Sequence, residues 1–280
     1  MIDDERSVSL RRMNFIAGRK PGWLLSEDDY FLVQILLEEG SDDDELAKDD
    51  SHTLEFTLGK GSGFQTSGVQ AMGRSILWTS ALYLSRWLAN SRNVFKDKVV
   101  IELGCGLALP SFVCDELGAK RVLATDYNSK ILKNVEANCK RNKAGNVHAM
   151  PLDFTRLAQV ARVQADVVLF SDIIYNDHLA KIVPPCLYLM LKNSRCKAYA
   201  VLPTAYRGPC LSLFFEALEK YKVSVARSDL EPAIVEGTTN DVLKCKLFAF
   251  TLQEYGDEGV DDEEEEGEEE MCAGFSSMFE

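Results

Sequence analysis

The sequence predicts an α/β fold in which a mostly parallel sheet carries helices on both faces. From residue 99 onward, short apolar runs typical of buried strands alternate with segments whose apolar residues recur at helical spacing. Late in this region two strands follow one another without a full helix between them. That arrangement predicts an antiparallel strand at the C-terminal edge of the sheet, formed as part of a hairpin.

Seven strands are expected in this region, separated by four main helices. The strands cover 99–103, 122–125, 147–150, 166–170, 198–202, 222–226 and 244–252. The helices cover 110–117, 130–141, 178–191 and 210–220. Because helices cover both faces of such a sheet, its inner strands are expected to be nearly continuous apolar runs.

Composition divides the chain into four expected parts. These are a partly disordered extension at 1–50, a strand and helix at 51–95 that pack on the core, the main domain at 96–255, and a disordered acidic tail at 256–280. The strand is expected at 53–58 and the amphipathic helix at 74–90.

Charge and cysteine content narrow the function classes. The net charge is −13, but residues 257–280 hold 12 acids and no Lys or Arg, so the remainder carries −13 + 12 = −1. No basic stripe for a nucleic-acid backbone is present, which disfavours nucleic acid as a partner. No pair of the eight Cys has C-x-x-C spacing, so we expect no metal. With no signal-peptide pattern or membrane-length apolar run, we expect a soluble monomer in the cytoplasm, with the nucleus as a second location.

A glycine-rich turn is the most informative motif. The apolar run Val99–Leu103 leads into Gly104-Cys105-Gly106, and a helix is expected to begin at Pro110. A dinucleotide site would need a third Gly at position 109, where this chain has Leu. The pattern is E-x-G-x-G instead, with Glu102 before the turn. An acidic surround favours a cationic ligand such as S-adenosylmethionine over a diphosphate.

An acid at the end of the next strand completes this motif. Asp126 follows Gly106 by twenty residues, at a position where a carboxylate can accept hydrogen bonds from both ribose hydroxyls. The alternative is a plain strand–helix turn with Asp126 capping the following helix.

Taken together, residues 74–207 resemble the seven-β-strand (class I) S-adenosylmethionine-dependent methyltransferases. Within them they most resemble the protein-lysine subgroup called methyltransferase family 16, because Asp172-Ile-Ile-Tyr175 matches its D-x-x-Y motif. The resemblance implies a Rossmann-like fold, S-adenosylmethionine as cofactor and a protein substrate such as a chaperone, a translation factor or an ATPase.

The resemblance also implies a set of cofactor contacts. The residues that match are Trp78, Gly104, Cys105, Gly106, Asp126, Asp153, Phe154, Ser171 and Tyr175, with Glu102 added from the turn motif. Relatives often have Gly where this chain has Ala108, and Trp where it has Phe154. Trp78 is also explained as a core residue of the amphipathic helix, and Asp153 as a helix cap.

Asp172 and Tyr175 are the candidate catalytic residues. A lysine amine has a reference pKa of about 10.4, so it arrives protonated and must lose a proton and be aligned. A carboxylate can hold the amine, and an aromatic ring can stack on a cation. The alternative is that Asp172 caps a helix and Tyr175 packs beside it. Tyr206 and Arg207 follow the fifth strand, where the lip of a substrate site would lie, but an ordinary surface loop is the favoured interpretation.

Other functions remain open from the sequence alone. Related chains also modify protein arginine or histidine. DNA amino-methyltransferases often have two prolines where this chain has Ile173 and Ile174. A non-catalytic module that keeps the fold, with or without cofactor, is the further alternative.

Overall fold

The chain was analysed as a computed structural model, which describes two sheets and the helices around one of them. The described residues are 7–10, 13–16, 30–36, 53–59, 78–194, 196–204, 207–230 and 245–252. The acidic segment 256–280, most of residues 1–50 and the first four residues of the predicted helix at 74–90 lie outside the described residues. The predictions made for those segments therefore stay predictions.

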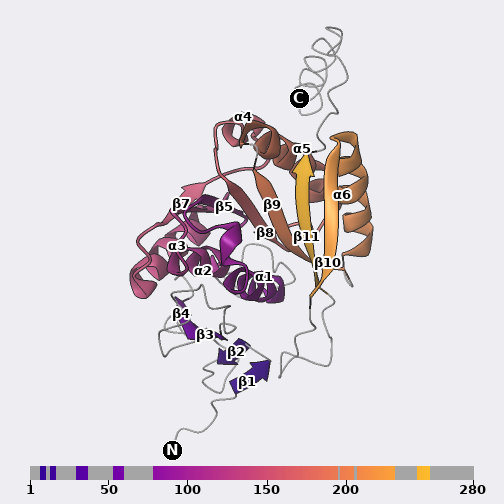
Figure 1. Ribbon diagram of the computed structural model, residues 1–280. Coiled ribbons are helices and arrows are strands. Elements are labelled where there is room, and N and C mark those ends of the chain that lie inside the picture. The colour runs from indigo at the N-terminus through magenta and orange to yellow at the C-terminus, as the bar shows by residue number, and fades with distance from the viewer. Residues whose placement is uncertain are drawn as a thin grey trace, which may run out of the picture.

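The larger sheet has the predicted seven strands, in the order β10-β11-β9-β8-β5-β6-β7. They are β5 (Val99–Leu103), β6 (Arg121–Asp126), β7 (Val147–Pro151), β8 (Val167–Ser171), β9 (Lys197–Pro203), β10 (Val223–Asp229) and β11 (Cys245–Leu252). Strands β7, β6, β5, β8 and β9 pair in parallel, and β11 pairs antiparallel with both β9 and β10. The predicted mostly parallel sheet is therefore confirmed (Figure 1).

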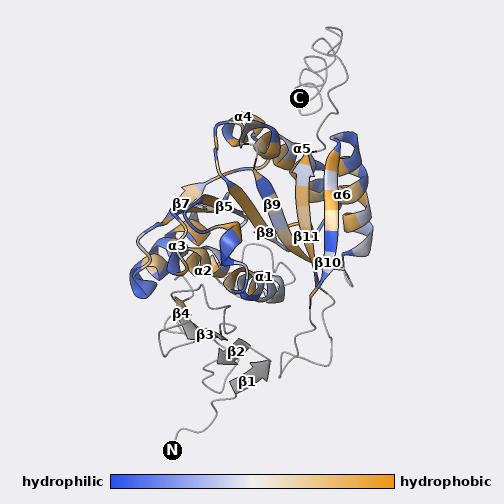
Figure 2. Cartoon of the chain, viewed as in Figure 1, coloured by the Kyte–Doolittle hydropathy of each residue, from blue (hydrophilic) through white to orange (hydrophobic). Residues whose placement is uncertain are grey.

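The predicted C-terminal hairpin is also confirmed, with one detail that the sequence did not indicate. The antiparallel strand β11 lies between β9 and β10, so the outermost strand is β10. Burial agrees with this order, because half of the β11 residues are buried and none is exposed, whereas β10 is exposed after its first two residues. In Figure 2, β10 has hydrophilic residues at one end, as an outermost strand can, whereas the central strand β8 is mostly hydrophobic.

Helices cover both faces of this sheet (Figure 1). They are α1 (Thr79–Ala89), the 3-10 helix η2 (Arg92–Val94), α2 (Leu109–Glu116), α3 (Ser129–Asn142), α4 (Leu157–Val160), α5 (Asp177–Ser194) and α6 (Gly208–Lys220). Alternate residues of a strand enter opposite cores: Val100 and Val167 pack with α1, α2 and α3, whereas Ile101 and Val168 pack with α5 and α6. None of the helices described is both long and apolar enough to cross a bilayer.

Helix α5 continues through two prolines. Pro184 and Pro185 remove two backbone donors from its interior, which alone would disfavour a helix. The flanking side chains of Val183, Cys186 and Leu187 are fully buried. Burial of this apolar face against the sheet therefore outweighs the missing hydrogen bonds.

A second, four-stranded antiparallel sheet precedes the main one. Its strands are β1 (Ser7–Leu10), β2 (Met13–Ile16), β3 (Tyr30–Leu36) and β4 (Thr53–Gly59), in that order. Only β4 was predicted. Strand β4 contacts α2 and α3, and Leu58 is fully buried in the core that these helices form with the main sheet.

The strand order determines where a ligand can bind. The chain runs outward from β5 through β6 to β7 and then returns to β8, which lies on the other side of β5. Open α/β sheets bind ligands outside the carboxyl ends of the strands at such a reversal point. The Gly104 turn leaves β5 and Asp172 follows β8, so both motifs lie at this point.

The aromatic cluster on the α5–α6 face should dominate the stability of the C-terminal half. Phe250 is fully buried, and its ring lies 5.5 Å from that of Phe170 and 6.1 Å from that of Phe214. We expect Phe250→Ala to lower the free energy of unfolding by about 3–5 kcal/mol. Val225→Ala, at an exposed position of β10, is the control and should cost well under 1 kcal/mol. Equal losses in urea unfolding would contradict the assigned packing.

Candidate functional site

A cavity of about 490 Å³ opens at the carboxyl ends of β5, β6 and β8. All but one of the residues proposed from the sequence line it. They are Trp78, Gly104, Cys105, Gly106, Asp126, Asp153, Phe154, Ser171, Asp172 and Tyr175. The structure therefore brings together side chains that are almost a hundred positions apart. Their individual contacts with a ligand stay predictions.

The glycine turn has three left-handed residues. The φ angles of Gly104, Gly106 and Ala108 are 62°, 54° and 60°. A Cβ on Gly104 would lie 2.8 Å from Cγ2 of Ile173, so glycine is required there for space as well as for φ. Ala108 accepts a conformation that costs an L-residue about 1–2 kcal/mol, which explains why glycine suits that position in relatives.

Backbone hydrogen bonds hold this turn against β6. The N–H of Cys105 donates to the carbonyl of Thr125 at 2.8 Å, and the N–H of Ala108 donates to the carbonyl of Cys105 at 2.7 Å. The Thr125 hydroxyl donates to the carbonyl of Glu102 at 2.7 Å. The turn is thereby fixed next to the end of the strand that carries Asp126.

Glu102 does not line the cavity. Its carboxylate accepts hydrogen bonds from the backbone N–H of Ser111, at 3.0 Å, and from the Ser111 hydroxyl. The side chain is buried beneath the turn, and burial raises its pKa to about 8. The sequence prediction placed Glu102 among the cofactor contacts. The structure instead gives it the task of holding the first turn of α2 against β5.

Asp126 ends β6 and faces the cavity with only 6% of its surface exposed. One carboxylate oxygen accepts a hydrogen bond from the N–H of Asn128 at 2.8 Å. Burial raises its pKa, while backbone N–H groups of Asn128, Gly106 and Tyr127 act in the opposite direction. Within the described residues, no Lys or Arg forms an ion pair with this carboxylate. It is therefore held by backbone donors, which leaves acceptor capacity for a ligand hydroxyl.

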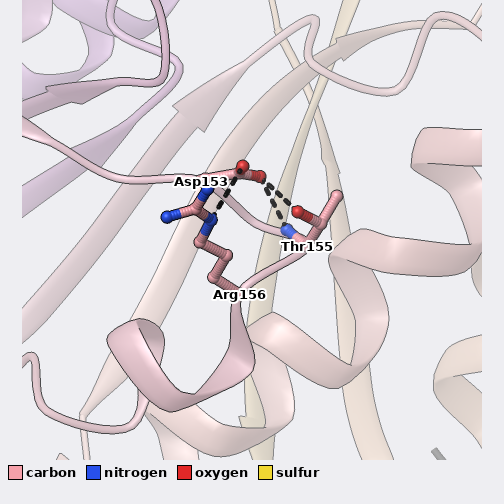
Figure 3. Close-up of polar contacts among 3 residues, drawn as sticks. All are labelled: Asp153, Thr155 and Arg156. Atoms are coloured by element: carbon pink, nitrogen blue, oxygen red, sulfur yellow. Dashed lines mark hydrogen bonds and ion pairs between the residues drawn. The ribbon is translucent and has the colours of Figure 1, made fainter. Parts of the chain in front are cut away.

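Asp153 closes a turn that precedes α4 (Figure 3). It does not cap this helix, because the N-cap residue of α4 is Arg156, which has no side-chain capping bond. Its carboxylate accepts from the backbone N–H of Thr155 at 3.0 Å and from the Thr155 hydroxyl at 2.7 Å, and it lies 3.7 Å from Nε of Arg156. These contacts shape the turn that leads into α4. Asp153 and Phe154 both line the cavity, so the predicted adenine contacts are still open to test.

Trp78 lies at the mouth of the cavity. It is the residue before the first turn of α1 and is 39% exposed. The sequence placed it within the helix and allowed a core role as well as a cofactor role. Its exposure contradicts the core role, because a core tryptophan would be largely buried.

Asp172 is paired with an arginine that the sequence analysis placed in a surface loop. Nε of Arg207 lies 3.0 Å from one carboxylate oxygen of Asp172, and Nη2 lies 3.3 Å from the other. The guanidinium carbon also lies 5.9 Å from the ring centre of Tyr175. Arg207 lines the cavity, so the surface-loop expectation was wrong for this residue.

Topology could have identified Arg207. Strands β8 and β9 are parallel neighbours, with Ser171 opposite Val201. Residues that follow β9 therefore emerge at the same edge of the sheet as Asp172. Tyr127, Asn176 and His178 also line the cavity without having been proposed for it.

Comparison with known proteins decides the family. A family model described as lysine methyltransferase matches residues 60–220, more than half of the 280 residues. The chain belongs to the lysine methyltransferase family. Its relatives include a protein N-terminal and lysine N-methyltransferase of Candida glabrata, 23% identical over 67% of this chain and 79% of the relative. The human electron transfer flavoprotein beta subunit lysine methyltransferase is 26% identical over 38% of this chain and 39% of the relative.

Solved structures agree on the fold. A Streptococcus mutans protein assigned as an S-adenosylmethionine-dependent methyltransferase aligns with a TM-score of 0.53 at 16% identity. The alignment covers 85% of this lysine methyltransferase and 58% of the other chain. At this identity the likeness supports the Rossmann-like architecture alone.

S-adenosylmethionine is the methyl donor of this enzyme, and the cavity residues fit it. Gly106 has no side chain, and no atom lies within 4 Å of where its Cβ would be, so a ligand can approach the backbone closely there. Asp126 offers a buried carboxylate to the ribose hydroxyls, and Phe154 offers an aromatic face for adenine. The cationic donor is also compatible with a cavity that contains three aspartates and one arginine.

The buried Glu102 should make stability depend on pH. Its folded pKa is about 8, whereas the ordinary value is 4.5, so the folded state holds an extra proton between these pH values. The free energy of unfolding should therefore fall as pH rises through this window, by up to about 1.4 kcal/mol per pH unit. Glu102→Gln should flatten the profile in urea unfolding from pH 5 to 9. Exposed Glu219→Gln is the control, and parallel profiles for wild type and Glu102→Gln would refute the assignment.

Asp126 should contribute to cofactor affinity through its charge. Asp126→Asn keeps an oxygen for the N–H of Asn128 but removes the charge. A hydrogen bond to a charged group is worth about 1.5–3 kcal/mol, so the Kd for S-adenosylmethionine should rise at least about tenfold. Asp166→Asn is the matched control, because Asp166 accepts from the N–H of Val99 at the opposite end of the sheet. An unchanged Kd by calorimetry for folded Asp126→Asn would exclude this role.

Proposed function

We propose that this lysine methyltransferase modifies the side-chain amine of a lysine in a folded protein substrate, with Asp172 as the residue that holds the amine. The observation that carries the proposal is the position of Asp172. Its carboxylate lines the same cavity as the glycine turn, at the end of the strand next to β5. The names of the relatives, which include a lysine methyltransferase for a flavoprotein subunit, favour a protein substrate.

The geometry around Asp172 suits a positioning role. Its φ of 47° turns the chain sharply at the end of β8, and its N–H donates to the carbonyl of Val201 at 3.2 Å. The carboxylate is thereby aimed by the backbone of two adjacent strands. When bound, S-adenosylmethionine supplies a methyl group on a sulfonium that is already a good leaving group. The protein therefore contributes mainly by aligning the amine and excluding water.

Tyr175 is proposed to form one wall of the site that receives the amine. It lines the cavity, and burial raises the pKa of its hydroxyl, so the ring remains neutral at physiological pH. An aromatic face next to the amine favours the methylated nitrogen of the product. The same site is proposed to exclude a nucleic-acid base, since the sequence shows no basic stripe that would hold the phosphates.

Tritium transfer from S-adenosylmethionine into a nuclease-treated lysate tests the function. We expect a labelled protein, with mass spectrometry placing the methyl group on a lysine ε-amine. A label on an α-amine would support the N-terminal activity named for the Candida glabrata relative. A label on arginine or histidine would refute the lysine assignment, and cofactor binding without any transfer would favour a binding module.

Asp172→Asn should separate transfer from cofactor binding. Asparagine tolerates positive φ, so the fold should persist. The loss of the carboxylate should lower the rate of transfer by about 10²-fold, the size expected for a misplaced nucleophile. Affinity for S-adenosylmethionine should stay close to wild type. Asp177→Asn, at an exposed position of α5, controls for removal of a nearby charge. A wild-type rate for Asp172→Asn would refute the role.

The acidic segment 257–280 lies outside the described residues, and its proposed role rests on charge alone. The sequence alone favours a role in solubility, and the further proposal is that its 12 acids attract a basic substrate and raise the encounter rate. Truncation after Tyr255 should lower kcat/KM by about tenfold at low salt, with the loss shrinking as salt screens the charge. A tail of equal length with Asn and Gln in place of the acids should behave like the truncation. Equal kcat/KM for all three proteins at low salt would leave solubility as the role of the segment.

A further inference from the structure

The ion pair between Arg207 and Asp172 raises a chemical question about the proposed reaction. Methyl transfer needs the lone pair of the lysine nitrogen, which forms the new N–C bond while the C–S bond breaks and its electron pair stays on sulfur. That lone pair is free only after the ammonium group has released one proton to solvent. An isolated carboxylate beside the ammonium would stabilise the charged form and so oppose this release.

We propose that Arg207 is a positioning residue that neutralises Asp172, so that the carboxylate orients the substrate amine without holding it as ammonium. The inference rests on the proposed function, since it assigns a lysine amine to Asp172. It adds a role for a cation that lies outside the D-x-x-Y motif.

The carboxylate of Asp172 has room for both Arg207 and a substrate amine. The guanidinium approaches Asp172 through two nitrogens, one to each oxygen, at 3.0 and 3.3 Å. A carboxylate has about four acceptor directions, so roughly two remain for another donor. The side chains of Asp172 and Arg207 are only 10% and 28% exposed, which limits screening of the pair by water. Both residues line the cavity, so an amine can approach the carboxylate from that side.

The position of Arg207 is fixed by the fold. It is the residue before the first turn of α6, and its carbonyl accepts from the N–H of Leu211 at 2.8 Å. Its guanidinium carbon lies over the ring of Tyr175 at 5.9 Å. The cation is thus held between a carboxylate and an aromatic ring, at a place where it repels an incoming ammonium and tolerates a neutral amine.

Arg207 also affects the protonation of the buried Asp172 carboxyl. Burial raises the pKa of the Asp172 carboxyl, and the hydrogen bonds and charge of Arg207 lower it. The pKa of Asp172 is raised on balance, and Arg207 opposes this rise, so the arginine favours the ionised, hydrogen-bond-accepting carboxylate while cancelling its net charge. Lysine at this position would keep the charge but lose the two-nitrogen contact.

Other titratable groups near the pair are few among the described residues. Tyr175 and Cys245 face Asp172, and Asp177 and Cys210 lie near Arg207. Asp126 and Tyr127 act on Tyr175 from the end of β6, and His178 lines the cavity from α5. Several of these groups can affect the pH dependence of the rate. The test therefore measures the pKa of the bound lysine amine directly.

The experiment follows the protonation of the bound lysine by NMR. The probe is the peptide that carries the lysine labelled in the lysate, with ¹³C at Cε, bound to enzyme and S-adenosylhomocysteine. In the wild type we expect the pKa of the bound amine below that of the free peptide. In Arg207→Met it should rise by about one to three units, the shift caused by a charge within about 4–6 Å. Arg207→Lys should stay near the wild type, and exposed Arg162→Met is the control for loss of a remote charge.

Kinetics supply an independent readout. In single turnover at saturating peptide, the pH at which the transfer rate reaches half its maximum should move upward in Arg207→Met by the same amount. The rate of this variant should recover toward wild type at high pH. A lower rate at every pH with an unmoved profile would overturn the proposal and leave Arg207 a structural role. A faster variant with a lower KM would also overturn it, since Arg207 would then compete with the substrate.

These experiments distinguish failure of the proposed function from failure of the role assigned to Arg207. If the wild-type enzyme labels no lysine, the proposed function fails and this inference fails with it. If the wild type labels lysine but the bound amine has the same pKa in wild type and Arg207→Met, only the role of Arg207 fails.

Discussion

The site depends on the close contact between the chain segments that leave β5 and β8. Gly104 has no side chain, and Cγ2 of Ile173 occupies the space where a Cβ would lie. Ile173 follows Asp172, so the glycine turn and the proposed amine-binding carboxylate are packed against each other. Both segments are left-handed at this contact, with φ of 62° at Gly104 and 47° at Asp172. A shift of one would therefore displace the other, which couples the geometry of the cofactor turn to that of the reacting end.

Three carboxylates around this contact differ in their partners, and the partners determine what each can do. Glu102 is buried beneath the turn with Ser111 as its donor, and its raised pKa of about 8 favours the neutral form at pH 7. Asp126 is held by backbone N–H groups, which suits an acceptor for uncharged hydroxyls. Asp172 is held by a guanidinium. A carboxylate thus supports the turn at Glu102, is placed to accept from uncharged hydroxyls at Asp126, and is proposed to orient an amine at Asp172.

Sequence periodicity predicted the sheet well because burial imposes it. Val100 and Ile101 face opposite cores and are both fully buried, so the run had to be apolar on both sides. Motif spacing also located the turn, Asp126 and Asp172. The role of Glu102 was missed because an acid at a strand end can face a cavity or the interior, and only the position of Ser111 decides between them. The contact between Arg207 and Asp172 was missed because it depends on β9 lying next to β8. That pairing brings together two residues that are 35 positions apart.

The pairing of Asp172 with Arg207 also bears on which nucleophiles the site can accept. A carboxylate whose charge is cancelled gives no net attraction to a permanent cation, and a guanidinium substrate cannot lose its proton at accessible pH. An amine can become neutral, and the hydrogen-bond acceptor that remains on Asp172 then favours it. An unpaired carboxylate would instead have stabilised a guanidinium in its charged form. The ion pair therefore supplies a physical reason for lysine over arginine that the D-x-x-Y motif alone does not contain. The motif specifies the carboxylate, whereas its electrostatic partner comes from the start of α6.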